Sequence, residues 1–124
     1  MFIKRVLLIF LLFFSLQAHA LQLLFVSTDW CPVCQQVNNE IAQTYQSTDL
    51  PLIKIDITNG VIENKDYANA YKNGIIGQLY GVPTFIIWDE VNKREIVRWV
   101  GYRSEEDWYK MLERVKIIAV SYTL

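Results

Sequence analysis

The stretch TDWCPVCQQ, residues 28–36, contains both cysteines of the chain, and only two residues separate Cys31 from Cys34. Two thiols at this spacing can close a small structural disulfide, supply two ligands to a metal ion, or exchange disulfide bonds with other proteins. The compartment in which the protein works, and the elements on which the two cysteines lie, distinguish between these three uses.

The first 20 residues have the pattern of a secretory signal peptide. Two basic residues precede an apolar run over residues 6–16, and the sequence AHA at 18–20 provides the small residues that signal peptidase needs. This run is well short of the roughly 20 residues that span a bilayer as a helix. We therefore predict cleavage after Ala20. The rival interpretation, an uncleaved anchor that extends to Val26, would consume the first strand of the fold.

Cleavage would give a mature domain of residues 21–124, which in a bacterium would lie in the periplasm. This part has 10 Lys and Arg against 13 Asp and Glu and no basic cluster, so electrostatics give no support to nucleic-acid binding. His19 is the only histidine and leaves with the signal peptide, which excludes a histidine base or a histidine-ligated metal. The domain is long enough for one modest core, and we expect no stable membrane insertion after cleavage.

The mature sequence alternates between strand and helix patterns. Apolar runs bounded by turn residues predict strands at residues 21–28, 52–57, 84–89 and 95–102. Apolar residues at helical spacing predict helices at residues 32–47 and 65–79, and a capping box at Ser104 opens a third. The third helix should bury one face, made of Trp108, Met111, Leu112, Val115 and Ile118.

The order β-α-β-α-β-β-α determines the expected topology. A helical crossover between the first two strands makes them parallel, and the polar turn at residues 90–94 makes the last two an antiparallel hairpin. The predicted fold is an α/β domain in which helices flank both faces of a mixed four-stranded sheet. This fold places the CPVC motif where the first strand meets the first helix.

The start of a helix favours thiolate chemistry. Its first backbone N–H groups are unsatisfied and carry a partial positive charge, which lowers the pKa of a cysteine placed there. Pro32 suits the first helical position, because its missing N–H is not needed there. Cys34 follows one turn later, close enough to form a disulfide. We therefore expect Cys31 to be the exposed nucleophile and Cys34 the more buried, resolving cysteine.

The other two uses of the motif are weaker. A disulfide that closes so short a loop adds little stability, because the entropic gain grows with loop length. A zinc site needs about four ligands, so two thiolates without a histidine leave it incomplete, although they could hold Cu(I). A module that binds Cu(I) without redox turnover therefore remains an alternative. For the exchange reaction itself we predict no metal and no other cofactor.

Three segments of the mature chain resemble one known family. WCPVC at residues 30–34, VPT at residues 82–84 and Gly101 before the last helix are similar to the thioredoxin superfamily, and the resemblance covers nearly the whole domain. It implies the thioredoxin fold and a redox-active Cys31–Cys34 pair. It also implies that Pro83 follows a cis peptide bond and lies against the cysteines, and that the backbone of Val82 pairs with an extended partner segment.

The same resemblance bears on partner contacts and on the direction of electron flow. It implies that Trp30 is an exposed partner contact and that Pro32, Val33, Val82 and Pro83 bind or support the substrate. The dipeptide Pro32-Val33 lies between the cysteines, so it also tunes the reduction potential. The stretches TFIIWD and WVGYRSEEDW are similar to the C-terminal domain of a membrane protein that feeds reductant into the periplasm, and to small periplasmic thioredoxins.

These relatives act as reductases. We therefore expect a monomeric periplasmic thiol–disulfide reductase. It would take electrons from a membrane-embedded thiol donor and pass them to disulfides of exported proteins. A thiol oxidase or a disulfide isomerase of the same fold is the nearest alternative.

The sequence also departs from the family pattern. The buried acid that many thioredoxins carry six residues before the nucleophile is replaced by Phe25, so the group that deprotonates Cys34 is not identified. Asp29 and Lys54 are near in sequence, but Asp29 fits a solvated loop charge better. The strand and helix that precede the active-site strand in ordinary thioredoxins are missing. The segment 58–77 is longer than in plain thioredoxins, and we expect an elaborated helix there, with a partner surface as the alternative.

Overall fold

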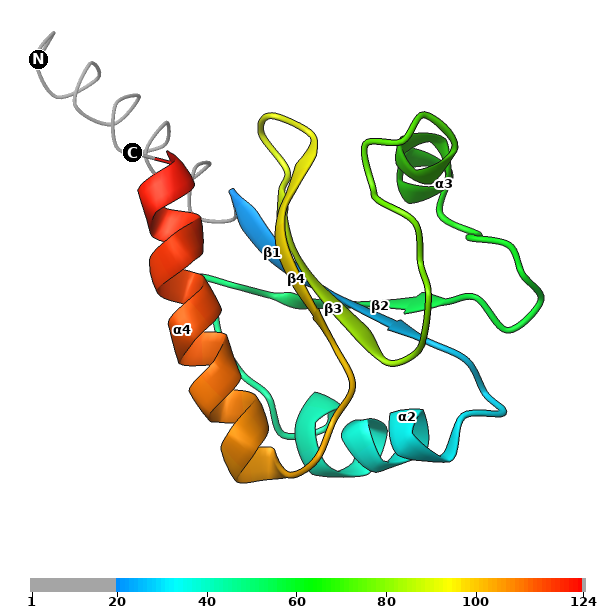
Figure 1. Ribbon diagram of the computed structural model, residues 1–124, viewed down its shortest axis with the longest axis vertical. Helices are drawn as coiled ribbons and strands as arrows, with labels where there is room; N and C mark the ends of the chain where they lie inside the picture. Colours follow the sequence, from blue (N-terminus) through cyan, green and yellow to red (C-terminus); the bar gives the residue numbers. More distant parts are fainter. Residues whose placement is uncertain (1–19, 124) are drawn as a thin grey trace, which may run out of the picture.

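The structure is a computed structural model that describes residues 20–123 (Figure 1). The predicted signal peptide, apart from Ala20, lies outside the described residues. The elements are β1 (Leu21–Ser27), α2 (Pro32–Val37), η1, a π-helical turn (Asn38–Ala42), β2 (Leu52–Asp56), α3 (Lys65–Lys72), β3 (Thr84–Asp89), β4 (Arg94–Val100) and α4 (Glu105–Thr123).

The four strands form one mixed sheet in the order β2-β1-β3-β4. β1 and β2 are parallel, in the register that pairs Ser27 with Asp56. β3 is antiparallel to β1 and to β4. The central position of β1 explains its composition, since a strand with neighbours on both sides and helices on both faces is apolar along its length.

Side chains of β1 alternate between two cores. Leu23 and Phe25 lie on one face, in a cluster with both cysteines and with residues of α2, η1 and α4. Leu24 and Val26 lie on the other face, in a cluster with residues of α3. In Figure 1, α4 and α2 accordingly flank the strands on the left and below, and α3 lies at the upper right. Helices on both faces of a mixed four-stranded sheet confirm the predicted α/β fold.

The two helices between the strands are shorter than predicted. The sequence predicts a helix over residues 32–47, but the π-helical turn η1 ends it at Ala42. The helix predicted over residues 65–79 ends at Lys72. Gly74 adopts φ +75° just beyond that end, and this left-handed conformation terminates helices. The predicted helix over this segment is therefore confirmed only in its first half.

Helix α4 begins at the predicted cap. The Ser104 hydroxyl accepts the Asp107 N–H at 3.2 Å, and the Ser104 carbonyl accepts the Trp108 N–H at 3.0 Å. Ile118 was predicted to be buried but is 43% exposed, because the helical repeat turns Ala119 inward in its place. The side chains of α4 that the core buries are Trp108, Leu112, Val115 and Ala119, whereas Met111, which was also predicted to be buried, is only partly buried against this core.

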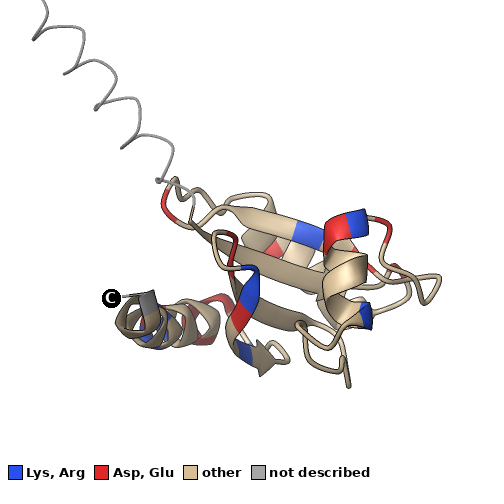
Figure 2. Ribbon diagram, turned by 90° about the horizontal axis from the view of Figure 1, so that it is seen from above, with Lys and Arg blue, Asp and Glu red and all other residues tan. Residues whose placement is uncertain are grey.

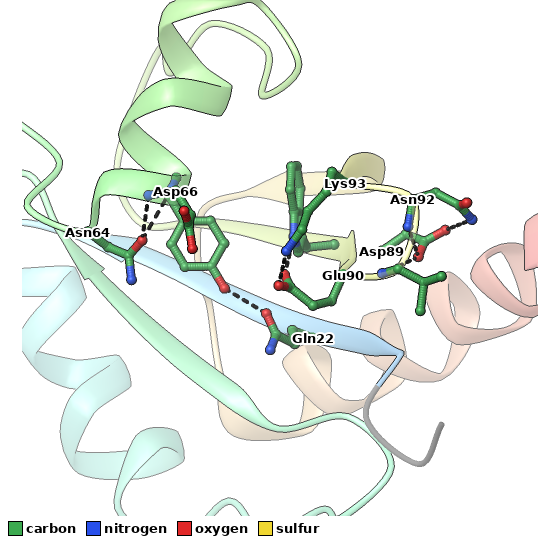
Figure 3. Close-up of polar contacts among 10 residues, drawn as sticks. Gln22, Asn64, Asp66, Asp89, Glu90, Asn92 and Lys93 are labelled. Atoms are coloured by element: carbon green, nitrogen blue, oxygen red, sulfur yellow. Dashed lines mark hydrogen bonds and ion pairs between the residues drawn. The ribbon is translucent and has the colours of Figure 1, made fainter. Parts of the chain in front are cut away.

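Polar contacts gather at the end of the sheet opposite to the CPVC motif (Figure 3). The buried carboxylate of Asp89 accepts hydrogen bonds from Asn92, and Glu90 forms an ion pair with Lys93. On the α3 side, the Tyr67 hydroxyl donates to Gln22 at 2.6 Å. The first two contacts stabilise the β3–β4 turn itself, and the third holds α3 against the start of β1. Within residues 20–123, none of the helices is both long enough and apolar enough to cross a membrane.

Candidate active site

The CPVC motif lies where β1 ends and α2 begins, as predicted. Cys31 is the N-cap residue of α2, with extended backbone angles, and Pro32 follows at the first helical position. The Cys34 N–H donates to Cys31 Sγ at 3.1 Å, and the Gln35 N–H donates to the Cys31 carbonyl at 3.1 Å. The sulfur of Cys31 therefore occupies the place of a capping side chain, where a negative charge is stabilised by the helix N-terminus.

The two cysteines are paired as a disulfide, with Cα atoms 5.2 Å apart. Cys34 is completely buried in the core that contains Phe25 and Val37, whereas Cys31 keeps 5% of its surface exposed. The predicted order of accessibility is therefore correct, but the expectation of an exposed Cys31 is wrong. The reason is packing, since Cys31 belongs to the same apolar cluster.

The loop of residues 81–84 lies against the cysteines. The peptide bond between Val82 and Pro83 is cis, as the family resemblance implied. The Val82 carbonyl oxygen lies 3.9 Å from Cys31 Sγ, and Pro83 is buried. A third loop supports this one, because the Gly101 N–H donates to the Pro83 carbonyl at 2.9 Å. The fold thus brings together three segments that are distant in sequence.

Large apolar side chains are exposed on the segments that carry the site. Trp30 is 67% exposed and Val33 is 38% exposed, so the predicted exposure of Trp30 is confirmed. Tyr80, just before the 81–84 loop, is 90% exposed, and Val100, which precedes Gly101, is 56% exposed. Sequence analysis did not identify Tyr80 or Val100; the proximity of Tyr80 to the Val82-Pro83 bond was the available signal.

Many thioredoxins have a buried carboxylate six residues before the first cysteine. Among the described residues of this chain, that position holds no carboxylate. Phe25 occupies that position, is fully buried and stacks on Phe85 with ring centroids 5.3 Å apart. Asp29 and Lys54 are both exposed, so neither belongs to the buried core around Cys34.

Three buried polar atoms have no hydrogen-bond partner within the part of the chain that the structure describes. They are Thr28 Oγ1, Asn38 Oδ1 and Trp108 Nε1. Asn38 follows Cys34 by one helical turn, and its N–H donates to the Cys34 carbonyl. The helix therefore places an unsatisfied amide oxygen one turn after Cys34, at a residue that sequence analysis did not single out.

Two side chains outside the motif hold the loops around the site. The Tyr102 hydroxyl donates to Glu40 of η1 at 2.7 Å, and burial together with this carboxylate raises the pKa of Tyr102. Arg98 of β4 donates to the carbonyls of Gly77 and Gln78, at 3.0 and 2.6 Å, and forms an ion pair with Glu95. These contacts link the segment before the 81–84 loop to the sheet. Sequence analysis missed them because the partners are far apart along the chain.

The described residues offer no further ligands to complete a metal site. Within residues 20–123, no three His, Cys, Asp or Glu side chains come together in a way that could hold a metal ion. This arrangement of the two cysteines provides a sulfur at a helix N-terminus and a buried second sulfur beside it. It also provides an exposed apolar rim, formed by Trp30 and Val33 next to the two cysteines.

The sequence matches the family described as thioredoxin-like domain over residues 15–116. Among solved structures, the chain is similar to the periplasmic thioredoxin SoxS from Paracoccus pantotrophus in its reduced form. The identity is 24%, the match covers 80% of this chain and 98% of that one, and the TM-score is 0.61.

Further likenesses are to thioredoxin f2 from Chlamydomonas reinhardtii and to a mutant thioredoxin from Halobacterium salinarum. The first has 22% identity, coverage of 79% and 81%, and a TM-score of 0.54. The second has 23% identity, coverage of 77% and 74%, and a TM-score of 0.53. No curated protein sequence shows a significant match. Since the family match spans most of the chain and the fold agrees, the chain belongs to the thioredoxin-like family, and its Cys31–Cys34 pair makes it a thiol–disulfide oxidoreductase.

Proposed function

We propose that the protein is an exported reductase, which uses Cys31 and Cys34 to reduce disulfides of other exported proteins in the periplasm. The observation that carries the proposal is the position of Cys31 Sγ, which accepts the Cys34 N–H at the start of α2 beside the exposed rim of the site. A thiolate there is stabilised by the helix N-terminus, so reduced Cys31 can act as a nucleophile near neutral pH.

The reaction transfers two electrons in two exchange steps. The Cys31 thiolate attacks one sulfur of a client disulfide, a bond forms between these two sulfurs, and the other client sulfur leaves as a thiolate. The Cys34 thiolate then attacks Cys31 Sγ, which closes the Cys31–Cys34 disulfide and releases the client as a dithiol. The Cα separation of 5.2 Å allows this closure within the native backbone.

A donor must return two electrons to the protein after each cycle. We propose a membrane-embedded dithiol protein, whose own disulfide forms as Cys31–Cys34 is reduced. The apolar run and AHA sequence at the N-terminus support export. The likeness to SoxS, which is itself described as a periplasmic thioredoxin, supports the same compartment. The exposed Trp30 and Val33 suit contact with an extended apolar segment of a client, and the protein would act as a monomer.

The direction of the reaction is tested by the reduction potential. The mature protein is equilibrated in glutathione and dithiothreitol buffers, and the fraction of alkylated Cys31 and Cys34 is read by mass. A potential near or below about −270 mV, as for thioredoxin, is expected for a reductase. A value near about −120 mV, as for a strong oxidase, would overturn the direction and make the protein a disulfide donor.

The compartment and the clients are tested in cells. The intact mass of the exported protein should correspond to a chain that begins at Leu21. In a Cys34→Ser variant, the mixed disulfide with the client cannot be resolved, so dithiothreitol-sensitive adducts should accumulate in the periplasm. A full-length chain in the membrane would contradict cleavage after Ala20, and the absence of adducts would contradict client exchange.

A further inference from the structure

Side chains of other segments bind the backbone of the segment that leads into the CPVC motif. Asp29 is exposed and precedes Cys31 by two residues. Its N–H donates to the side-chain oxygen Thr58 Oγ1 at 2.9 Å, and its carbonyl accepts Gln35 Nε2 at 2.9 Å. Thr58 follows β2, and Gln35 belongs to α2. Both hydrogen-bonding groups of one peptide residue in an exposed turn are thus bound by side chains from two other elements.

The carboxylate of Asp56 determines how the Thr58 hydroxyl is oriented. Thr58 donates its only hydroxyl proton to Asp56 Oδ1, and the Thr58 N–H donates to the same oxygen at 2.8 Å. A lone pair of the hydroxyl oxygen then faces the Asp29 N–H. These two hydrogen bonds lower the pKa of Asp56, so the acceptor is ionised at neutral pH.

The end of β2 is itself fixed to β1 at this point. Asp56 pairs with Ser27 in the parallel register, and the Ile57 N–H donates to the Ser27 carbonyl at 2.9 Å. Asp56 and Thr58 therefore start from a rigid part of the sheet. The hydrogen bond from Asp29 to Thr58 extends that rigidity by one more contact, to within two residues of the reactive sulfur.

We infer that Thr58, oriented by Asp56, is a positioning residue that keeps Cys31 Sγ on the Cys34 N–H at the start of α2. The inference rests on the exchange chemistry of the proposed function, but not on its direction. The stabilisation of a thiolate by a helix terminus falls off within the first turn, so a small displacement of the sulfur raises its pKa. Water can replace the Thr58 oxygen at the exposed Asp29 N–H, so loss of the contact should change Cys31 more than the stability of the fold.

The test is the thiolate pKa of Cys31. It is measured from the pH dependence of iodoacetamide alkylation and of thiolate absorbance, in chains that carry Cys34→Ser so that Cys31 is the sole thiol. Thr58→Val removes the hydroxyl and keeps the shape of the side chain. We expect its alkylation rate below the pKa to fall roughly threefold, which corresponds to a pKa about half a unit higher. Thr58→Ser, which restores the hydroxyl, should behave as the parent does.

A matched control uses another exposed threonine. Thr44 also donates a hydroxyl hydrogen bond, to the Glu40 carbonyl at 3.2 Å, but it lies beyond η1 and does not touch the motif. Thr44→Val should leave the pH profile of Cys31 unchanged. Urea unfolding of each variant shows whether the fold is intact.

Asp56→Ala provides a second, independent variant. It leaves Thr58 in place but frees its hydroxyl to rotate, so a smaller rise of the Cys31 pKa is expected. The inference is overturned if both Thr58→Val and Asp56→Ala keep the parent pH profile, or if Thr44→Val shifts it equally. If Cys31 of the parent chain were not alkylated at all, in contrast, the exchange chemistry itself would be overturned, and Thr58 would have no reactive thiolate to position.

Discussion

The two ends of β1 use hydrogen bonds in opposite ways. At its start, the β3–β4 turn surrounds the carboxylate of Asp89, which is 2% exposed, with several donors. At its end, Cys31 Sγ accepts one N–H, from Cys34, and lies among apolar side chains. The first arrangement fixes an ionised carboxylate in one place. The second leaves a sulfur that can change its bonding partner, which thiol–disulfide exchange requires.

The charge at the turn is stabilised by direct contacts. Asp89 accepts the Val91 N–H at 3.0 Å, the Asn92 N–H at 3.1 Å and Asn92 Nδ2 at 2.8 Å, and it pairs with Arg94 at 3.4 Å. Burial alone would raise the pKa of Asp89, but these hydrogen bonds outweigh burial and lower it.

Figure 2 shows residues of opposite charge, basic in blue and acidic in red, next to each other on α3 and on β4. The comparison therefore predicts that stability and activity can be changed separately at the two ends.

The largest effect is expected at the sulfur end and concerns activity alone. Cys31→Ser should lower the rate of disulfide reduction to the uncatalysed rate, because a serine hydroxyl is not ionised near neutral pH and cannot replace the thiolate. The rate is measured by insulin reduction with dithiothreitol as the electron source. The free energy of unfolding of the reduced chains should change by less than about 1 kcal/mol, since the two side chains differ by one atom and removing a hydrogen bond of this kind costs about that much.

A Cys31→Ser protein that retained a substantial part of the rate would contradict the assignment of the nucleophile. In that case Cys34 would be the attacking thiol. The attack would then come from a completely buried sulfur. The contrast between a fixed charge at one end of β1 and a reactive Cys31 at the other would no longer hold.

The next effect is expected at the turn and concerns stability alone. Asp89→Ala leaves the donors of Val91, Asn92 and Arg94 without their acceptor. We expect the free energy of unfolding to fall by about 2–3 kcal/mol, as is usual when a buried charged acceptor is removed from its donors. Urea unfolding followed by tryptophan fluorescence measures it. Asp89→Asn, which keeps one acceptor oxygen, should lose less.

The matched readout for Asp89→Ala is the alkylation rate of Cys31. It should equal that of the parent chain, because the turn and the CPVC motif lie at opposite ends of β1. A slower alkylation in the folded variant would show that the two ends are coupled.

The smallest effect is the pH dependence that Asp89 imposes. A carboxylate whose pKa is lowered in the folded state contributes stability that is fully present above its unfolded pKa of about 3.9. This contribution is lost as the pH falls through the folded pKa. The parent chain should therefore lose stability more steeply than Asp89→Asn between pH 5 and the acid limit of the titration. Parallel curves of unfolding free energy against pH would show that the turn does not hold Asp89 as a charge.

Sequence patterns were sufficient where the information was local. The Ser104 cap, the apolar face of the last helix and the strand-to-helix junction at Cys31 depend on residues within a few positions of one another, and all three are present. Errors occurred where neighbours from elsewhere decide the outcome. Cys31 is buried because it packs with side chains of other elements, whereas the error at Ile118 was local, since the helical repeat turns Ala119 inward in its place.

The order of secondary elements, the position of the two cysteines and the place of Phe25 in the core follow from the sequence by itself. Spacing and apolar periodicity encode them directly, and the resemblance of the VPT segment anticipated the cis bond beside Cys31. The link from Asp56 through Thr58 to Asp29 was decided only by the tertiary structure. It joins residues 29 positions apart, and it exists because the parallel register places Asp56 beside Ser27, at the point where the chain turns into the active site.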